Sequence, residues 1–171
     1  MSFLIFSYRH QDIIARKSAL NFKLLQLNKK LMDLQTYAAN IADGSVSMND
    51  LMTVPPSLFN RMSVFMQYSH QSAMMGAQQK LPFMMQAGVM PQVQDPMMQR
   101  QYQQMLFKNL YDQEREKASK VEEKILHQQE LKIEQEKASI ETQLKALDAE
   151  EEKVKSAEDE GAKKSAPQYV A

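Results

Sequence analysis

The chain of 171 residues contains no cysteine and no tryptophan, and it has only four glycines. The lack of cysteine excludes disulfide bonds and thiolate chemistry. The sequence shows neither a glycine-rich phosphate loop nor a serine nucleophile motif. No apolar run approaches the ~20 residues of a transmembrane helix. Because no catalytic motif stands out, we expect a protein without enzymatic activity.

An excess of charge is also missing, since 21 Lys and Arg residues balance 21 Asp and Glu residues. No basic run is interleaved with aromatic residues, so we expect no nucleic-acid binding. The charges are unevenly spread: residues 1–43 hold six basic and three acidic side chains, whereas residues 107–171 hold twelve and sixteen. The two ends can therefore attract each other or a second copy of the chain.

Residues with the spacing of metal ligands are absent as well. The three histidines, His10, His70 and His127, fall in different segments, and a zinc site needs several convergent ligands. The many carboxylates after residue 107 alternate with lysine, which is typical of a solvated helix face. We therefore expect neither a metal nor a cofactor.

The clearest positive signal is a heptad repeat in residues 10–43. Apolar residues recur every seven positions in two rows, which alternate at spacings of four and three, as in the seam of a coiled coil. Lys17 is the one polar residue of the second row. Residues 1–43 are thus predicted to form an N-terminal coiled-coil helix. Its interface residues are Ile13, Leu20, Leu27, Leu34 and Ile41 in one row, with Leu24, Leu31 and Ala38 in the other.

A second long helix is predicted over residues 96–158. Asp95 can cap its first backbone N–H groups, and Pro96 suits the first helical position. Charged residues interrupt the companion row of its seam, so we expect the end beyond about residue 125 to project or to pair loosely. Residues 159–171 are predicted to be a flexible tail. The interface residues of this helix are Leu126, Ile133, Ile140, Leu147 and Val154.

Between these helices, residues 44–95 form a methionine-rich helical middle and connector. Ser47 and Asp50 have the spacing of a capping box, a helix is predicted from Leu58 to about Lys80, and Pro82 is expected to open a broken connector. Twelve of the fourteen methionines lie between Met48 and Met105.

We favour packing of these methionines in an irregular core over an adaptable partner surface, and both over a Cu(I) site. The candidate partner surface consists of Met62, Phe65, Met66, Met84, Met85, Met97 and Met98.

The apolar segment "SFLIF" near the N-terminus is expected to tuck against a helix. Contact of its side chains between Phe3 and Phe6 with a membrane or a partner is the less favoured alternative. The segment is five residues long and lacks a preceding basic stretch and a small-residue cleavage site. We favour a cytoplasmic location, with export without a cleaved signal peptide as the alternative.

The segment "QTYAANIADGS" at positions 35–45 closes the heptad helix. Its "AANIAD" resembles the Asn-Ile-Ala-Asn turn near the start of flagellar rod and hook proteins. The layout is similar to that of axial proteins exported by flagellar-type and type III systems, which join a terminal helix to a long C-terminal helix around a variable middle. Asp43 departs from the pattern, and the usual Gly-Tyr is missing. The resemblance implies export and assembly, and it assigns no residue a role.

The sequence therefore predicts an all-α fold in which the two terminal helices associate antiparallel. A basic row at Arg16, Lys23 and Lys30 would face an acidic or neutral row that includes Glu136 and Glu150. The leading hypothesis for function is a structural or interaction protein that works by helix–helix association, within itself or with copies. An exported axial or translocator-type subunit and a chaperone-like adaptor with a methionine-rich face are the alternatives.

Overall fold

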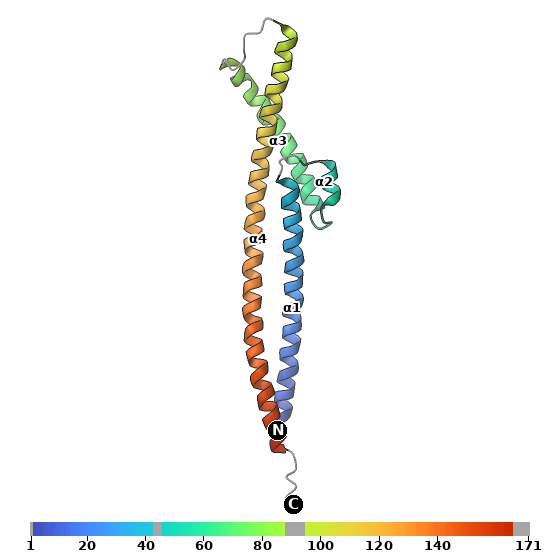
Figure 1. Ribbon diagram of the computed structural model, residues 1–171, viewed down its shortest axis with the longest axis vertical. Helices are drawn as coiled ribbons and strands as arrows, with labels where there is room; N and C mark the ends of the chain where they lie inside the picture. Colours follow the sequence, from blue (N-terminus) through green and yellow to red (C-terminus); the bar gives the residue numbers. More distant parts are fainter. Residues whose placement is uncertain (1, 43–45, 88–94, 166–171) are drawn as a thin grey trace, which may run out of the picture. The chain divides into compact units, whose positions relative to one another are not determined.

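The computed structural model describes residues 2–42, 46–87 and 95–165. These residues form four helices and no strand: α1 (Ser2–Ile41), α2 (Met48–Thr53), α3 (Phe59–Gln86) and α4 (Pro96–Ser165) (Figure 1). The predicted all-α fold is confirmed. Neither proline nor glycine occurs in α1, and no proline follows Pro96 in α4, which allows both helices to run without interruption.

Two helix starts follow directly from local side chains. Ser47 accepts a hydrogen bond from the backbone N–H of Asp50, and the Asp50 carboxylate accepts one from the backbone N–H of Ser47, which completes the capping box of α2. At the start of α4, Oδ1 of Asp95 accepts a hydrogen bond of 2.9 Å from the backbone N–H of Met97. Both predicted caps are confirmed.

Two helices extend further than the sequence predicted. Pro82 lies inside α3 rather than in a connector. Its ring is exposed and it stands within the last turn and a half, so only one backbone hydrogen bond near the helix end is lost. Helix α4 continues through Gly161 to Ser165, so residues 159–165 of the expected flexible tail are helical. Residues 166–171 lie outside the described residues.

The chain divides into two compact units. Unit 1 comprises residues 1–30 and 131–171, and unit 2 comprises residues 31–130. Helices α1 and α4 each contribute a segment to both units.

Unit 1 is a pair of antiparallel helix segments, visible side by side in Figure 1. Its direction follows from the ion pairs, because Lys17 contacts Glu151 whereas the earlier residue His10 also reaches the later Glu158. The buried apolar side chains of this unit are Ile13, Leu27, Ile133 and Ile140. The expectation that the far end of the long helix projects or pairs loosely is therefore wrong.

Unit 2 packs parts of α1 and α4 with α2 and α3. Its core includes a cluster in which Ala77 lies with Leu106 and Leu110, and in which half-buried Leu81, Met84, Phe107 and Tyr111 pack around them. The other buried apolar side chains are Leu34, Tyr37, Ile41, Val46, Val54, Met62, Phe65, Ala73 and Leu126.

Small residues let α3 approach α4 closely in unit 2. Ser69, Ala73 and Ala77 are fully or almost fully buried along one face of α3. A Cβ atom built on Gly76 would lie 2.9 Å from Cγ of Glu114, so glycine is needed there unless the Glu114 side chain moves. The small late residues of α3 therefore set the spacing between the two helices.

We expect Leu27→Ala to lower the free energy of unfolding by roughly 2–5 kcal/mol, because it removes a large side chain from a buried position. Leu27 is 8% exposed, whereas Met32, five residues later in the same helix, is 66% exposed. Met32→Ala is thus the matched control and should change the free energy by about 0.5 kcal/mol or less. Urea unfolding followed by circular dichroism measures both, and equal effects would contradict the assignment.

Candidate helix-association interface

The predicted interface residues all lie at buried or half-buried positions. Ile13, Leu27, Leu34 and Ile41 of α1 are buried, as are Leu126, Ile133 and Ile140 of α4. The remaining members are half-buried: Leu20, Leu24, Leu31, Ala38, Leu147 and Val154.

The companion row of α4, which the sequence marked as interrupted by charge, also lies toward the interface. Glu123, Glu130, Lys137, Leu144 and Glu151 are all half-buried. The interface thus combines one apolar row with one largely charged row on α4.

Lys17, the single polar residue of the second row of α1, pairs with this charged row in unit 1. Its Nζ atom lies 2.6 Å from Oδ1 of Asp148 and 2.7 Å from Oε2 of Glu151. The Glu151 side chain is only 14% exposed and also accepts a hydrogen bond from Lys155, one helical turn later. A carboxylate held between two ammonium groups neutralises what would otherwise be unpaired charge at a helix interface.

These contacts shift the pKa values of Glu151 and Lys17. Hydrogen bonds from Lys155 and then from Lys17 lower the pKa of Glu151 from 4.5 to about 2. Hydrogen bonds to Asp148 and Glu151 raise the pKa of Lys17. Both residues are therefore charged across the physiological pH range, and the pair stays ionic.

Further ion pairs extend the contact toward the start of α1. The guanidinium of Arg9 pairs with Glu150, with Nε donating to Oε1 at 2.8 Å. His10 lies between two carboxylates, with Nε2 at 3.5 Å from Glu151 and Nδ1 at 3.4 Å from Glu158. Thus the first helical turns of α1 meet the acidic part of α4.

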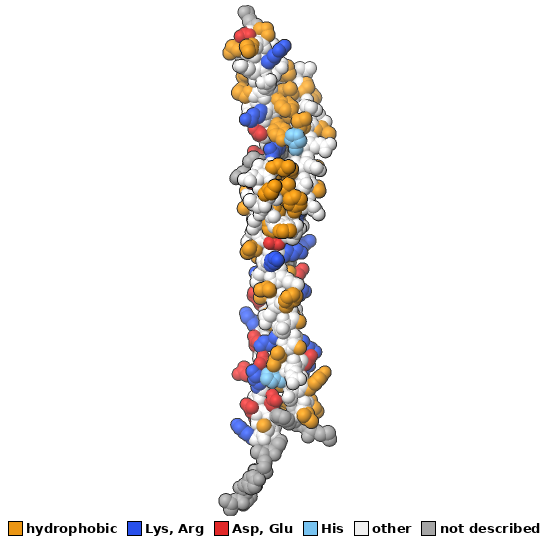
Figure 2. Space-filling view, turned by 90° about the vertical axis from the view of Figure 1, so that its right-hand side faces the viewer, with side chains coloured by type: hydrophobic (Ala, Val, Ile, Leu, Met, Phe, Trp, Pro, Cys, Tyr) orange, Lys and Arg blue, Asp and Glu red, His pale blue; other side chains and the backbone are white. Residues whose placement is uncertain are grey.

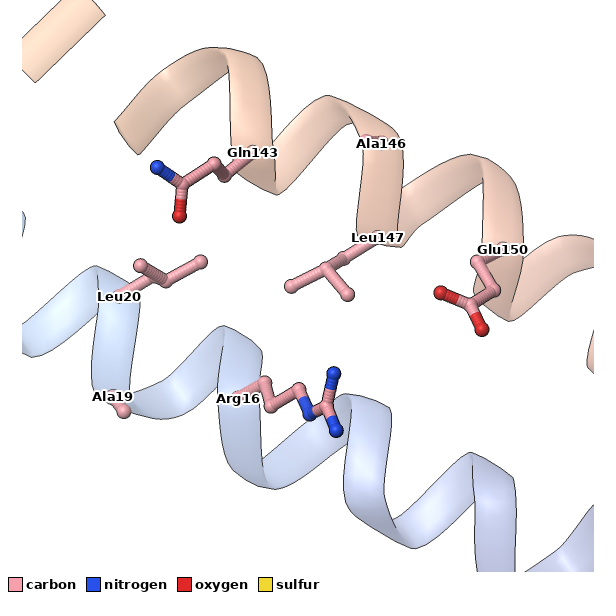
Figure 3. Close-up of a pocket in the computed structure, with 7 residues that line it drawn as sticks. All are labelled: Arg16, Ala19, Leu20, Gln143, Ala146, Leu147 and Glu150. Carbon is pink, nitrogen blue, oxygen red and sulfur yellow. The ribbon is translucent and has the colours of Figure 1, made fainter. Parts of the chain in front are cut away.

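A groove with a volume of about 450 Å³ opens between the two segments of unit 1. Leu20 and Leu147 point into it from opposite helices, and Arg16 and Glu150 approach it at one end (Figure 3). The small side chains of Ala19 and Ala146 complete the lining, and Gln143 lies beside Leu20. The groove exists because alanines flank the Leu20 and Leu147 contact where larger residues would fill the space.

In unit 1, the expected contact between the flanking rows is found at Glu150. Glu150 binds Arg9, which stands one heptad before Arg16 in the same row, whereas Arg16 binds Asp12 of its own helix at 3.0 Å. Lys23, Lys30 and Glu136 are exposed and form no ion pair within the described residues. Charge pairing in unit 1 also runs through the interface rows, where Lys17 contacts Glu151.

Unit 2 holds a second polar network at the interface. Tyr37 is fully buried and donates a hydrogen bond of 3.1 Å to Oε1 of Glu122. Arg61 of α3 donates to the same oxygen at 2.7 Å and to Gln129 at 2.6 Å, and its guanidinium stands 5.4 Å from the centre of the Tyr37 ring. Burial, followed by the charge of Glu122, raises the pKa of the Tyr37 phenol, which therefore remains a donor.

Sequence reasoning missed Tyr37 and Arg61. Tyr37 falls outside both heptad rows, and Arg61 belongs to a helix for which we assigned no partner. The spacing of Tyr37 from Leu34 and Ile41, three and four residues away, was the available signal.

The methionines occupy the surface more often than the core. Of the candidate partner surface, Met62 and Phe65 are buried and Met66 and Met84 are half-buried. The expectation that these methionines mainly fill a core is wrong, because most of the described methionines between Met48 and Met105 are exposed. The exposed ones are Met48, Met52, Met74, Met75, Met85, Met97, Met98 and Met105.

Apolar side chains also line a second side of α1 within unit 1. We use the name outer face of α1 for a set of six large apolar side chains that are between 50% and 76% exposed. Because Leu4 and Ile5 belong to it, the expectation that "SFLIF" tucks against a helix is wrong for these two residues; the side chain of Phe3 lies outside the described residues, and Phe6 is half-buried. The members of the outer face are Leu4, Ile5, Tyr8, Ile14, Phe22 and Leu25.

Within the described residues, no group of three or more acidic or histidine side chains is placed to hold a metal ion. Among the same residues, no helix combines the length and the hydropathy that crossing a membrane requires. No protein-family model, no curated protein and no solved structure matches the chain.

The pKa of Glu151 predicts a specific acid response. A carboxylate whose pKa is lower in the folded than in the unfolded chain stabilises the fold above the unfolded pKa, near 4.5, and this contribution is lost as the pH falls toward about 2. Glu151→Gln should therefore be less stable than the parent at pH 6, and the difference should vanish near pH 2. Glu152→Gln is the matched control at an exposed neighbouring position. Urea midpoints between pH 2 and 7 test this, and a pH-independent difference would refute it.

The polar network of Tyr37, Arg61 and Glu122 predicts that a single substitution lowers stability more than a double substitution does. Arg61→Met should cost about 1–3 kcal/mol, because it leaves the Glu122 charge, in a side chain that is 15% exposed, without its cation. Adding Glu122→Gln removes that charge, retains an acceptor for Tyr37 and should restore part of the stability. Thermal unfolding of the three variants measures this, and a lack of any recovery would contradict the role given to Arg61.

Proposed function

We propose that this protein is a non-enzymatic structural or interaction protein that works by helix–helix association, and that the outer face of α1 binds a second copy of the chain. The observation that carries the proposal is that α1 has two apolar sides. Phe22 and Leu25 point roughly 150° away from Leu20, at ~100° per residue. A helix with apolar side chains on two sides fits between two neighbours.

The size of the outer face supports a protein partner. Six large side chains that are roughly two-thirds exposed present on the order of 800 Å². The largest apolar patch of a typical monomer covers about 300–600 Å². A standard interface buries about 800 Å² on each partner. The outer face supplies at most this area, because Ile5 and Ile14 lie about 180° apart around the helix and one partner covers only part of the set.

The residue spacing of the outer face favours a second copy of the chain over an unrelated partner. Leu4 and Leu25 are three heptads apart and Tyr8 and Phe22 are two heptads apart, so a helix of the same repeat would meet these four side chains at matching positions. The intervening heptad positions hold Gln11, Ala15 and Ser18. The outer face is continuous with the helix pair of unit 1, so association would add helices to an existing contact. An axial-subunit role would be one form of the same self-association.

Light scattering coupled to size-exclusion chromatography tests the proposal across a concentration series. The parent chain should gain mass at micromolar concentration. The double variant Phe22→Gln with Leu25→Gln should need at least a tenfold higher concentration for the same gain, because it removes apolar area from the contact. The matched control, Ile125→Gln with Leu131→Gln, alters two exposed side chains of α4 that are 42% and 43% exposed.

Either of two results would contradict the proposal. A parent chain that stays monomeric up to about 100 μM, or a double variant that assembles like the parent, refutes association through the outer face. Circular dichroism of each variant confirms that the helices are retained.

One observation favours a second candidate function, a chaperone-like adaptor. Figure 2 shows hydrophobic side chains gathered over unit 2, where the exposed methionines lie. Methionine side chains re-pack easily around varied apolar partners. A monomer that binds unfolded apolar peptides, and that loses binding in Met97→Gln with Met98→Gln, would support the adaptor over self-association.

A further inference from the structure

A groove in unit 2 is lined by hydrogen-bond donors and by the cation Arg115. It has a volume of about 310 Å³, and its described lining residues are Val46, Met66, Gln67, His70, Tyr111 and Arg115. None of these six residues carries a carboxylate. We call this the Arg115 groove.

Among the described lining residues, Arg115 carries the only permanent charge. Its side chain is half-buried, and one terminal nitrogen donates a hydrogen bond of 3.1 Å to the backbone oxygen of Val46. Its Nε atom is buried without a hydrogen-bond partner, and within the described residues the guanidinium forms no ion pair. Leaving a partly buried cation without a counter-charge is unfavourable, and an anion in the groove would remove that cost.

The neighbours of Arg115 add donors of suitable geometry. Nδ1 of His70 lies 2.7 Å from the Tyr111 hydroxyl, and the two rings meet edge to face at a centroid distance of 5.7 Å. When the phenol donates to Nδ1, the Nε2 atom of His70 carries the proton and is a donor. The Gln67 amide is exposed beside it and can donate as well.

The apolar residues of the lining favour a carboxylate over a phosphate as the bound anion. Val46 is buried, Met66 is half-buried, and the Tyr111 ring lies 5.7 Å from the Arg115 guanidinium. A doubly charged phosphate would face one cation and an apolar wall. A carboxylate matches the planar guanidinium in charge and geometry, and an attached apolar group can lie against Met66 and Val46.

We propose that the Arg115 groove binds a carboxylate attached to an apolar group, with Arg115 as its cationic anchor and with His70 and Gln67 as additional donors. The carboxylate comes either from a small carboxylic acid or from a protein side chain, including one of a second copy. This site lies on unit 2 and is independent of the outer face of α1.

Titration of the full-length, ¹⁵N-labelled chain with hexanoate, followed by NMR, tests the proposal. Hexanoate should shift the Nε–H signal of Arg115 and the backbone amides near residues 66–70 and 111–115 in a saturable manner. Hexylamine and inorganic phosphate should not produce these shifts. Increasing salt should weaken binding, because the contact is charged.

Variants assign the binding to the groove. Arg115→Gln should weaken hexanoate binding at least tenfold, while Arg100→Gln, at an exposed position of the same helix, should leave it unchanged. Because Arg115 also holds the Val46 carbonyl, Gln67→Glu provides a second test that keeps this contact. It places a carboxylate beside Arg115 and should likewise weaken hexanoate binding at least tenfold.

The two sources of the carboxylate are separated by a dilution series without hexanoate. Shifts of the Arg115 signal with protein concentration, reversed by hexanoate, would identify a second copy as the source, and their absence would leave a small carboxylic acid. The proposal is overturned if hexanoate causes no saturable shift, if Arg115→Gln or Gln67→Glu binds it as tightly as the parent, or if phosphate binds equally well.

Discussion

The contact of Lys17 with Glu151 is the constraint on which the helix pair of unit 1 depends. Both residues stand in interface rows that are otherwise suited to apolar packing, and each neutralises the other. A slip of one heptad in one direction would place Lys17 against Leu144, and a slip in the other direction would place Glu151 against Leu24. Either slip leaves a charge against a leucine at a helix interface, which is unfavourable. Exposed ion pairs add little affinity, so the leucine and isoleucine rows supply the stability while this pair selects the register.

That division of roles explains why α1 and α4 differ so strongly in their exposed surfaces. Helix α4 covers its solvent side with charge, including the pairs Glu116 with Lys120 and Glu151 with Lys155, each at 2.7 Å. In unit 1, α4 has one neighbour, which is α1. Helix α1 carries the exposed basic row of Arg16, Lys23 and Lys30, and it also carries the apolar outer face. The asymmetry gives α1 the capacity for a second contact, and it is the physical basis for preferring association over a solitary helix pair.

The sequence predicted helices and their caps well because these features depend on neighbouring residues. The heptad rows, the capping box at Ser47 and the Asp95 cap all follow from spacings of seven or fewer residues. The predictions about contacts between helices were less accurate, because they required knowledge of the partner helix. The seam of α4 was predicted to be loose because its charged row was counted as a defect, and only the position of Lys17 on α1 shows that Glu151 of this row is paired across the interface. The exposure of most methionines had no local signal, since methionine suits core and surface alike.

Two arginines of unit 2 show how the same side chain can complete one network and leave another open. Arg61 reaches Glu122, Gln129 and the Tyr37 ring, so its charge and most of its donors are matched within the chain. Arg115 lies over an aromatic ring as well, at 5.7 Å from Tyr111, but its only hydrogen-bond partner in the described part of the chain is a backbone carbonyl. Helix α4 carries abundant glutamate, yet Glu114, beside Arg115, is engaged by Lys80 and Lys117. The carboxylate of its sequence neighbour is therefore already paired with lysine, and within the described residues Arg115 forms no ion pair, which is the feature that an added anion would satisfy.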